Sequence, residues 1–322
     1  MTDDVIVREA TDADEPGILE LLSASLQWDR DERFESFFRW KHYESPFGPS
    51  PAWVALVGDR VVGFRVWLRW RFVQSGEQWE AVRAVDTATH PDFQGRGIFR
   101  RLTMQSIECL RERDVAHVFN TPNDNSRPGY LKMGWEQVGE LPVVVRFRSP
   151  AAAVRAARSR ASSSAERWSI PTELAQPADE VLSDAGLIDE FIKARPDDGA
   201  IRTKVDAEFL RWRYGFGPLH YRGVLTDGGL ALFRLRRRGT GVECVVGNVL
   251  ATSRRAEQAL ITTVAKESKA DQMIRLSFAP VWWRGEFALP GGGPVLTWRA
   301  VNETRMPPLQ AWDLTMGDIE LF

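Results

Sequence analysis

Residues 82–102, VRAVDTATHPDFQGRGIFRRL, predict a β-strand, a turn, a glycine-containing loop and the first turns of a helix. The β-branched residues that begin at Val82 favour a strand. Pro91 ends this strand because it offers no backbone N–H to a ladder. Gly95 and Gly97 remove side chains where a backbone must approach a partner closely. The residues that follow place apolar side chains near one face of a 3.6-residue helix.

A strand, a glycine loop and a helix start together favour binding of an anion. The first turn of a helix has N–H groups without intrahelical partners, and the helix dipole is positive at that end. Such a terminus is suited to phosphate. The stretch therefore predicts an anion site at Gly95–Gly97.

Length and composition narrow the class of protein. A chain of 322 residues with 43% hydrophobic residues can form about two domains. The net charge of −2 gives no general case for nucleic acid or an anionic membrane as partner. Cys109 and Cys244 lie far apart in the sequence, so we expect no metal and no disulfide framework.

The N-terminal sequence MTDDVIVREATDADE is acidic and lacks the basic and apolar regions of a signal peptide. No apolar run approaches the roughly 20 residues that span a bilayer. We therefore expect a soluble, cytoplasmic protein, and the oligomeric state stays open.

The order of strand and helix patterns predicts a mixed α/β (α+β) fold. Residues 149–171 are rich in alanine, serine and arginine and poor in large apolar residues. We place a domain boundary there. The predicted parts are an N-terminal domain over 1–149, a linker over 150–175 and a C-terminal domain over 176–322.

The two halves resemble each other. FFRWKHY at 37–43 is echoed by FLRWRY at 209–214, and both follow a helical pattern and precede a Gly/Pro loop and two strands. Val82–Thr89 then corresponds to Glu243–Thr252, which indicates a duplicated fold. The second copy has no glycine loop, so we expect the anion site in the first copy alone.

The sequence HPDFQGRGI at 90–98 resembles the acyl-CoA binding motif of the GCN5-related N-acetyltransferases, the GNAT superfamily. That motif is Gln/Arg-x-x-Gly-x-Gly/Ala after a strand, and Gln94 and Gly97 match it. Phe99 stands where the family has Gly or Ala, so we expect it to crowd the first helical turn.

A second motif of the same family follows at the expected distance. The family has an Asn, a Tyr seven residues later, and Gly-aromatic four and five residues after that. Asn123, Tyr130, Gly134 and Trp135 have this spacing. Two motifs in order extend the resemblance over residues 4–148, and it suggests a tandem member with a degenerate second copy.

The resemblance implies a central mixed, mostly antiparallel sheet flanked by helices. It also implies an N-acyltransferase that uses acetyl-CoA as co-substrate and a primary amine of a small molecule or peptide as acceptor. It places the pantetheine arm along a strand edge and the pyrophosphate on the loop. The residues so assigned are Ala88, Thr89, Gln94, Gly95, Arg96, Gly97, Ile98 and Phe99.

Tyr130 would be the general acid that protonates the departing thiolate, and Asp86 our candidate base, directly or through water. Asn123 completes the candidate catalytic set. Each has a structural alternative: Tyr130 as a packing residue, Asp86 as a strand acid beside Arg83, and Asn123 as a loop cap. Glu80 is the second candidate for the base.

Two other functions stay open. One is an aminoacyl-tRNA-dependent aminoacyltransferase of peptidoglycan type, disfavoured by the intact Gln94–Ile98 loop and the absence of a basic face. The other is a non-catalytic CoA-binding regulatory protein. Fold does not fix the acceptor; we expect its pocket to involve residues 28–50 and the second half.

Overall fold

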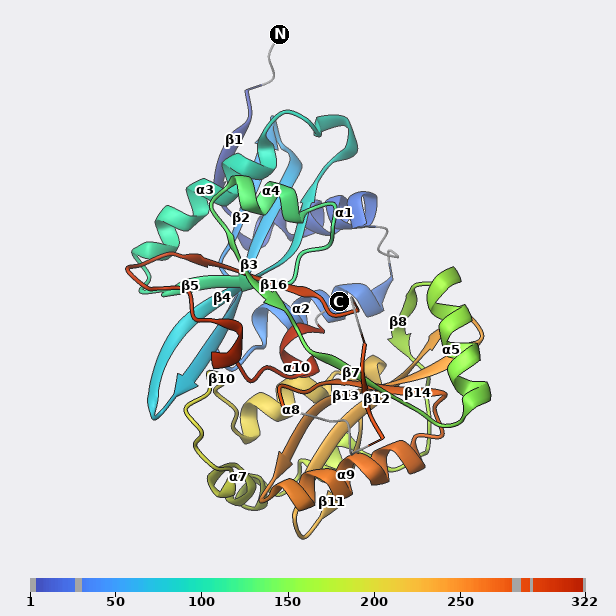
Figure 1. Cartoon of the computed structure of the whole chain (residues 1–322). Coiled ribbons are helices and arrows are strands. Elements are labelled where there is room, and N and C mark those ends of the chain that lie inside the picture. Colours follow the sequence, from blue (N-terminus) through green and yellow to red (C-terminus); the bar gives the residue numbers. More distant parts are fainter. Residues whose placement is uncertain (1–3, 27–30, 280–284, 290–291, 321–322) are drawn as a thin grey trace. The chain divides into compact units, whose positions relative to one another are not determined.

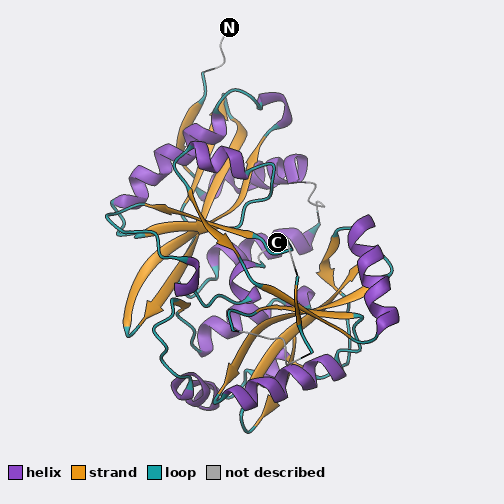
Figure 2. Cartoon of the chain, in the orientation of Figure 1, coloured by secondary structure: helices purple, strands orange, loops and turns teal. Residues whose placement is uncertain are grey.

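The computed structural model describes residues 4–26, 31–279, 285–289 and 292–320 (Figure 1). These residues form two compact units. The first comprises Met1–Val73, Glu77–Gly139 and Pro294–Pro308, and the second comprises Gln74–Gly76, Glu140–Gly293 and Leu309–Phe322. Each unit has a mixed, mostly antiparallel sheet flanked by helices (Figure 2), which confirms the predicted fold class.

The first unit has a sheet of order β1-β2-β3-β4-β5-β16-β6. β4 and β5 pair in parallel, whereas the printed pairs β1–β2, β2–β3 and β5–β16 are antiparallel. Its elements are β1 (Ile6–Glu9), α1 (Glu15–Leu26), α2 (Glu32–Tyr43), β2 (Ala52–Val57), β3 (Arg60–Gln74), β4 (Glu77–Thr89), α3 (Ile98–Arg111), β5 (His117–Asn120), α4 (Arg127–Lys132), β6 (Glu136–Glu140) and β16 (Val295–Ala300).

The second unit has a sheet of order β9-β11-β12-β13-β14-β7-β15, and β8 pairs with β12. Its elements are β7 (Val143–Phe147), α5 (Pro150–Ser162), β8 (Ala165–Ser169), β9 (Gln176–Pro177), α6 (Ala178–Val181), α7 (Ala185–Ala194), β10 (Arg202–Thr203), α8 (Ala207–Gly215), β11 (Arg222–Thr226), β12 (Gly229–Arg238), β13 (Gly241–Ala251), α9 (Arg254–Glu267), β14 (Gln272–Leu276), β15 (Phe287–Ala288) and α10 (Met316–Ile319).

The two sheets correspond strand by strand, which fits the predicted duplication. β1 to β5 of the first unit take the places of β9, β11, β12, β13 and β14 of the second. In each sheet the fourth and fifth strands form a parallel pair. A helix follows the fourth strand in both copies, α3 in one and α9 in the other.

The sixth strand of each sheet comes from the other half of the chain. β16 pairs with β5 in the first unit, and β7 pairs with β14 in the second. In Figure 1, red β16 therefore lies beside teal β5, and green β7 beside orange β14. The units thus differ from the contiguous domains expected at 1–149 and 176–322, because backbone pairing rather than chain order assigns a strand to a sheet.

The stretch expected to be a linker, 150–175, contains α5 and β8. Ser149 caps α5 by accepting a hydrogen bond from the backbone N–H of Ala152. The helix buries small residues, with Ala152 fully enclosed and Ala156 2% exposed. A helix can pack closely through alanine alone. The segment is therefore part of the folded unit although it lacks large apolar residues.

β3 organises the core of the first unit through the alternation of its side chains. Gly63, Arg65 and Trp67 face α3 and α4: a Cβ at Gly63 would meet Ile98 of α3, and Trp67 Nε1 donates to Ser106 Oγ at 2.9 Å. On the opposite face, Phe64 packs near the ring of Phe38 from α2. Successive side chains of a strand point to opposite faces of the sheet, so the buried residues of β3 contact helices on both faces.

Candidate active site

β4 and β5 part after three paired positions. The parallel ladder joins Ala81 to His117, Val82 to Val118 and Arg83 to Phe119. β4 continues beyond this point to Thr89, whereas β5 ends at Asn120. The backbone of β4 past Arg83 therefore has no partner from β5, and an extended ligand can add to such an edge as a strand would.

Asp86 interrupts the side-chain alternation of β4. Its φ of +41° lies in the left-handed region, which aspartate tolerates better than most residues. Val82 and Ala84 belong to the core cluster with α3, yet Asp86 contacts α2 instead. Thr87 returns to the α3 and α4 side, where its Oγ1 accepts a hydrogen bond from Arg65.

The predicted anion loop has open backbone donors. Gly95 and Gly97 have φ values of +74° and +75°, and a Cβ at either position would meet no atom within 4 Å. Gly97 is the N-cap of α3, and no side chain caps this terminus. The first N–H groups of α3 are thus available to an anion.

Basic side chains flank this loop. Arg96 and Arg100 are exposed, and Arg96 lies over the ring of Phe93 at 4.8 Å. Gln94 Nε2 is 3.4 Å from the carbonyl oxygen of Thr89, which also accepts a hydrogen bond from Ser25 Oγ at 3.2 Å. Ala88 is buried in the same stretch of β4.

Phe99, which we expect from the sequence to crowd the first turn of α3, contacts α4. Its ring meets the ring of Tyr130 edge-on, with centroids 5.4 Å apart and planes at 89°. A Cβ at Gly129 would lie 3.3 Å from the same ring. The large residue at the motif's sixth position is therefore accommodated under α4, where Gly129 leaves room for it.

Tyr130 lies on α4 and is 5% exposed. Its hydroxyl oxygen accepts a hydrogen bond from Arg65 Nη1 at 2.8 Å. The guanidinium of Arg65 is fully buried. Arginine has no role in the motifs that led to Tyr130, so nothing in the sequence indicated this contact.

Asp86 is held by two basic residues of α2. Its Oδ2 lies 2.7 Å from Lys41 Nζ and 2.9 Å from His42 Nε2, and its side chain is 6% exposed. Burial alone would raise the pKa of Asp86, but the charge of Lys41 and the hydrogen bonds from His42 and Lys41 lower it to about 2. Burial lowers the pKa of His42, which keeps the imidazole neutral.

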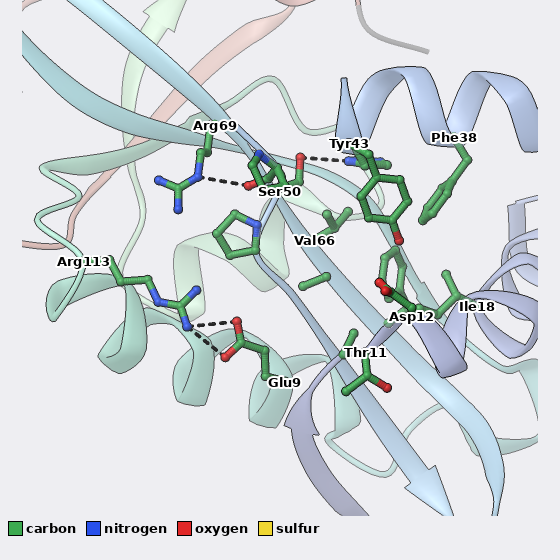
Figure 3. Close-up of a pocket in the computed structure, with 16 residues that line it drawn as sticks. Glu9, Thr11, Asp12, Ile18, Phe38, Tyr43, Ser50, Val66, Arg69 and Arg113 are labelled. Carbon is green, nitrogen blue, oxygen red and sulfur yellow. Dashed lines mark hydrogen bonds and ion pairs between the residues drawn. The ribbon is translucent and has the colours of Figure 1, made fainter. Parts of the chain in front are cut away.

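A hydrogen-bonded chain leads from Asp86 to a pocket of about 240 Å³. Figure 3 shows the residues that line this pocket. His42 Nδ1 lies 3.1 Å from Ser50 Oγ, and both residues line the pocket. Asp12 and Tyr43 also line it. Residues 28–30 of the stretch at 28–50, which we expect to bind the acceptor, lie outside the described residues.

Asn123 is exposed and caps the turn before α4. Its Oδ1 accepts hydrogen bonds from the backbone N–H of Ser126 at 2.9 Å and from Ser126 Oγ at 3.0 Å. These contacts fit the structural alternative for Asn123. Glu80, the second candidate for the base, is paired with Arg71 at 2.6 Å, in the part of β4 before the strands separate.

The second unit retains the strand separation without the loop. Its parallel ladder ends at Val245 and Ile274. The N-terminus of α9 is already capped, since Ser253 Oγ accepts from the N–H of Ala256, and Glu257 adds a negative charge in the first turn. This terminus is less suited than that of α3 to an anion.

Comparison with known proteins identifies the first unit. Residues 6–138 match the family model described as acetyltransferase (GNAT) domain. Residues 6–138 therefore carry a GNAT domain. None of the curated proteins compared matches the sequence.

Solved structures resemble nearly the whole chain. A conserved protein of unknown function from Enterococcus faecalis V583, titled a probable N-acyltransferase, is 11% identical with a TM-score of 0.68; the match covers 93% of this chain and 73% of that one. A GCN5-related N-acetyltransferase from Kribbella flavida is 17% identical with a TM-score of 0.64, over 93% and 71%. Eis1 from Mycobacterium abscessus is 14% identical with a TM-score of 0.59, over 92% and 74%. At these identities the likeness concerns the fold.

Among the described residues, no helix is both long and apolar enough to cross a membrane. The same residues bring together no group of three or more His, Cys, Asp or Glu side chains that could hold a metal ion.

Proposed function

We propose that this chain transfers an acetyl group from acetyl-CoA to a primary amine, and that the first unit carries the reaction. The observation that carries the proposal is the parting of β4 and β5 after Arg83, next to the uncapped α3 terminus. An extended arm and a diphosphate need these two features side by side.

The co-substrate supplies an activated acetyl thioester, and the chain's own groups hold it. The N–H groups from Gly95 to Phe99 would bind the pyrophosphate, with Arg96 and Arg100 adding positive charge. The edge of β4 that β5 leaves unpaired, near Ala88 and Thr89, would bind the arm. The left-handed conformations of Gly95 and Gly97 support this placement, because they open the loop backbone.

Tyr130 would serve as general acid. The amine nitrogen attacks the thioester carbon, an N–C bond forms, the C–S bond breaks, and the leaving thiolate takes the hydroxyl proton of Tyr130. Its hydroxyl oxygen is already engaged as an acceptor by Arg65, so the proton is free to point elsewhere. The position of α4 beside the N-terminal part of α3, through the Phe99 contact, supports the role.

The amine must also lose a proton. With a pKa of about 2, Asp86 does not retain a proton at neutral pH, so it can act only through a neighbouring group. The chain Ser50–His42–Asp86 offers that route, because the carboxylate of Asp86 accepts from His42 Nε2 and leaves Nδ1 to accept a proton through Ser50. We therefore propose Asp86 as the last member of a proton relay that begins in the pocket of Figure 3.

A turnover screen tests the proposal. Purified chain is incubated with acetyl-CoA and, separately, amino sugars, polyamines, amino acids and peptides, and free CoA is measured with a thiol reagent. We expect release above the hydrolysis rate with one class, and its near loss in Tyr130→Phe. Binding of acetyl-CoA without release in any class would favour the regulatory alternative. No binding would reopen the aminoacyl-tRNA alternative.

A further inference from the structure

Arg65 is a buried cation without a carboxylate. Among the largest fully buried side chains are three arginines. Arg234 pairs with Glu320, and Arg213 donates to the backbone oxygens of Gly317 and Glu320. Arg65 has no ion pair with any described residue, and its Nε and Nη2 are buried without a hydrogen-bond partner among them. Burying an unpaired charge destabilises a fold, so we expect the contacts of Arg65 to serve a function that offsets this cost.

The contacts of Arg65 all lie on the side of β3 that faces α3 and α4. Nη1 donates to Tyr130 Oη at 2.8 Å and to Thr87 Oγ1 at 2.6 Å. The guanidinium carbon lies 3.9 Å from the ring centre of Trp67, and 5.3 and 5.8 Å from those of Tyr130 and Phe99. Aromatic faces offset part of the lost hydration of the cation.

This geometry orients the hydroxyl of Tyr130. A guanidinium can only donate, so the oxygen of Tyr130 is the acceptor and its single proton must go to another group. No other described residue forms a hydrogen bond with this hydroxyl in the structure. After the proton is given away, the phenolate would lie at hydrogen-bond distance from a fixed positive charge, where such bonds are strongest.

We propose that Arg65 is a positioning residue for Tyr130: it holds the phenol oxygen, leaves the proton free for the leaving thiolate and stabilises the phenolate that results. The inference rests on the proposed function, because it concerns the same acid. It adds a residue of β3 that neither GNAT motif of the sequence contains.

A double-mutant cycle tests the role. Arg65→Met and Arg65→Lys are measured for kcat and for KM of acetyl-CoA, in the wild-type background and in Tyr130→Phe. Arg65→Met should lower kcat by about 10–100-fold, the usual effect of a lost charge-assisted hydrogen bond, and leave KM within about threefold. In Tyr130→Phe the same change should lower kcat by less than about threefold. Arg65→Lys, which retains a donor and the charge, should recover at least about tenfold over Met.

Equal losses in both backgrounds, or a rise in KM with kcat unchanged, would overturn the positioning role. Thermal melting checks the fold, and Met is chosen because an apolar replacement of a buried charge is often tolerated. Arg213→Met is the matched control: Arg213 is also fully buried and donates to a tyrosine, Tyr221, but in the second unit. It should leave kcat unchanged.

A second readout does not depend on turnover. The chain has four tyrosines, so ¹³Cζ-labelled tyrosine gives a simple spectrum in which Tyr130→Phe identifies one signal. That signal should move in Arg65→Met, return towards its original position in Arg65→Lys and stay in place in Arg213→Met. A signal unmoved by Arg65→Met would refute the contact and with it the inference. Absence of turnover with a moving signal would instead count against the proposed function alone.

Discussion

The ring of Phe99 lies edge-on against the ring of Tyr130, with centroids 5.4 Å apart. Phe99 occupies the motif position at which the GNAT family has Gly or Ala, and Tyr130 is our candidate acid. Phe99, which departs from the first motif, thus packs against Tyr130, which belongs to the second motif. An edge-to-face pair of this kind stabilises the fold beyond what the burial of the two rings contributes.

This relationship predicts the effect of restoring the family residue. Phe99→Ala should lower kcat by about threefold or more, since Tyr130 loses a packing partner, and should not tighten acetyl-CoA binding. Steady-state kinetics and titration calorimetry measure the two effects. Binding that becomes tenfold tighter would show instead that Phe99 obstructs the pyrophosphate.

The general acid is tested by Tyr130→Phe. We expect kcat for CoA release to fall by about 10²–10⁴-fold, the usual share of general acid–base catalysis, with little change in acetyl-CoA affinity. Tyr221→Phe is the control, because it removes the hydroxyl of another buried tyrosine bonded to a buried arginine. Unchanged turnover in Tyr130→Phe would refute the acid role.

Asp86 should make stability depend on pH. Its folded-state pKa of about 2 lies below the ordinary value near 3.9, so its contribution is present above about pH 4 and is lost as pH falls towards 2. The difference in unfolding free energy between wild type and Asp86→Asn should shrink by about 2–3 kcal/mol between pH 7 and pH 2.

Urea unfolding at several pH values measures this difference. Asp124→Asn serves as the control, because that carboxylate is 89% exposed and pairs with Arg127 at the surface. A constant difference between wild type and Asp86→Asn across the range would show that Lys41 and His42 do not hold Asp86 in its charged form.

The loop is tested by Gly97→Val. A β-branched residue at φ +75° is strained and would crowd the first N–H groups of α3, so we expect acetyl-CoA affinity to fall by at least about tenfold. Gly58→Val places the same residue at φ +57° in the β2–β3 turn, also with no atom within 4 Å. That variant should lose similar stability and keep its affinity, and equal losses of affinity would contradict the assignment.

The sequence alone was sufficient to predict the glycine loop and the correspondence between the two copies, because both depend on the spacing of residues that are close in the chain. Gly95, Gly97 and Tyr130 could be located by motif and by periodicity. The side that Asp86 faces could not, since one residue with positive φ reverses the alternation of β4 and no pattern marks it.

Other features depend on contacts between distant residues. Arg65 and Lys41 read in the sequence as ordinary charges of a strand and a helix, yet both are fully buried. Likewise, β7 and β16 look like continuations of their own halves. Only the pairing of β16 with β5 and of β7 with β14 shows which sheet receives them.

The central claim is that one acyl-CoA site exists per chain, on the α3 loop of the first unit. Titration calorimetry of acetyl-CoA into the full chain, wild type and Gly97→Val, tests it most directly. We predict one site in the wild type and none at the same concentrations in Gly97→Val. Two equal sites, no binding at all, or binding unaffected by Gly97→Val would contradict the account.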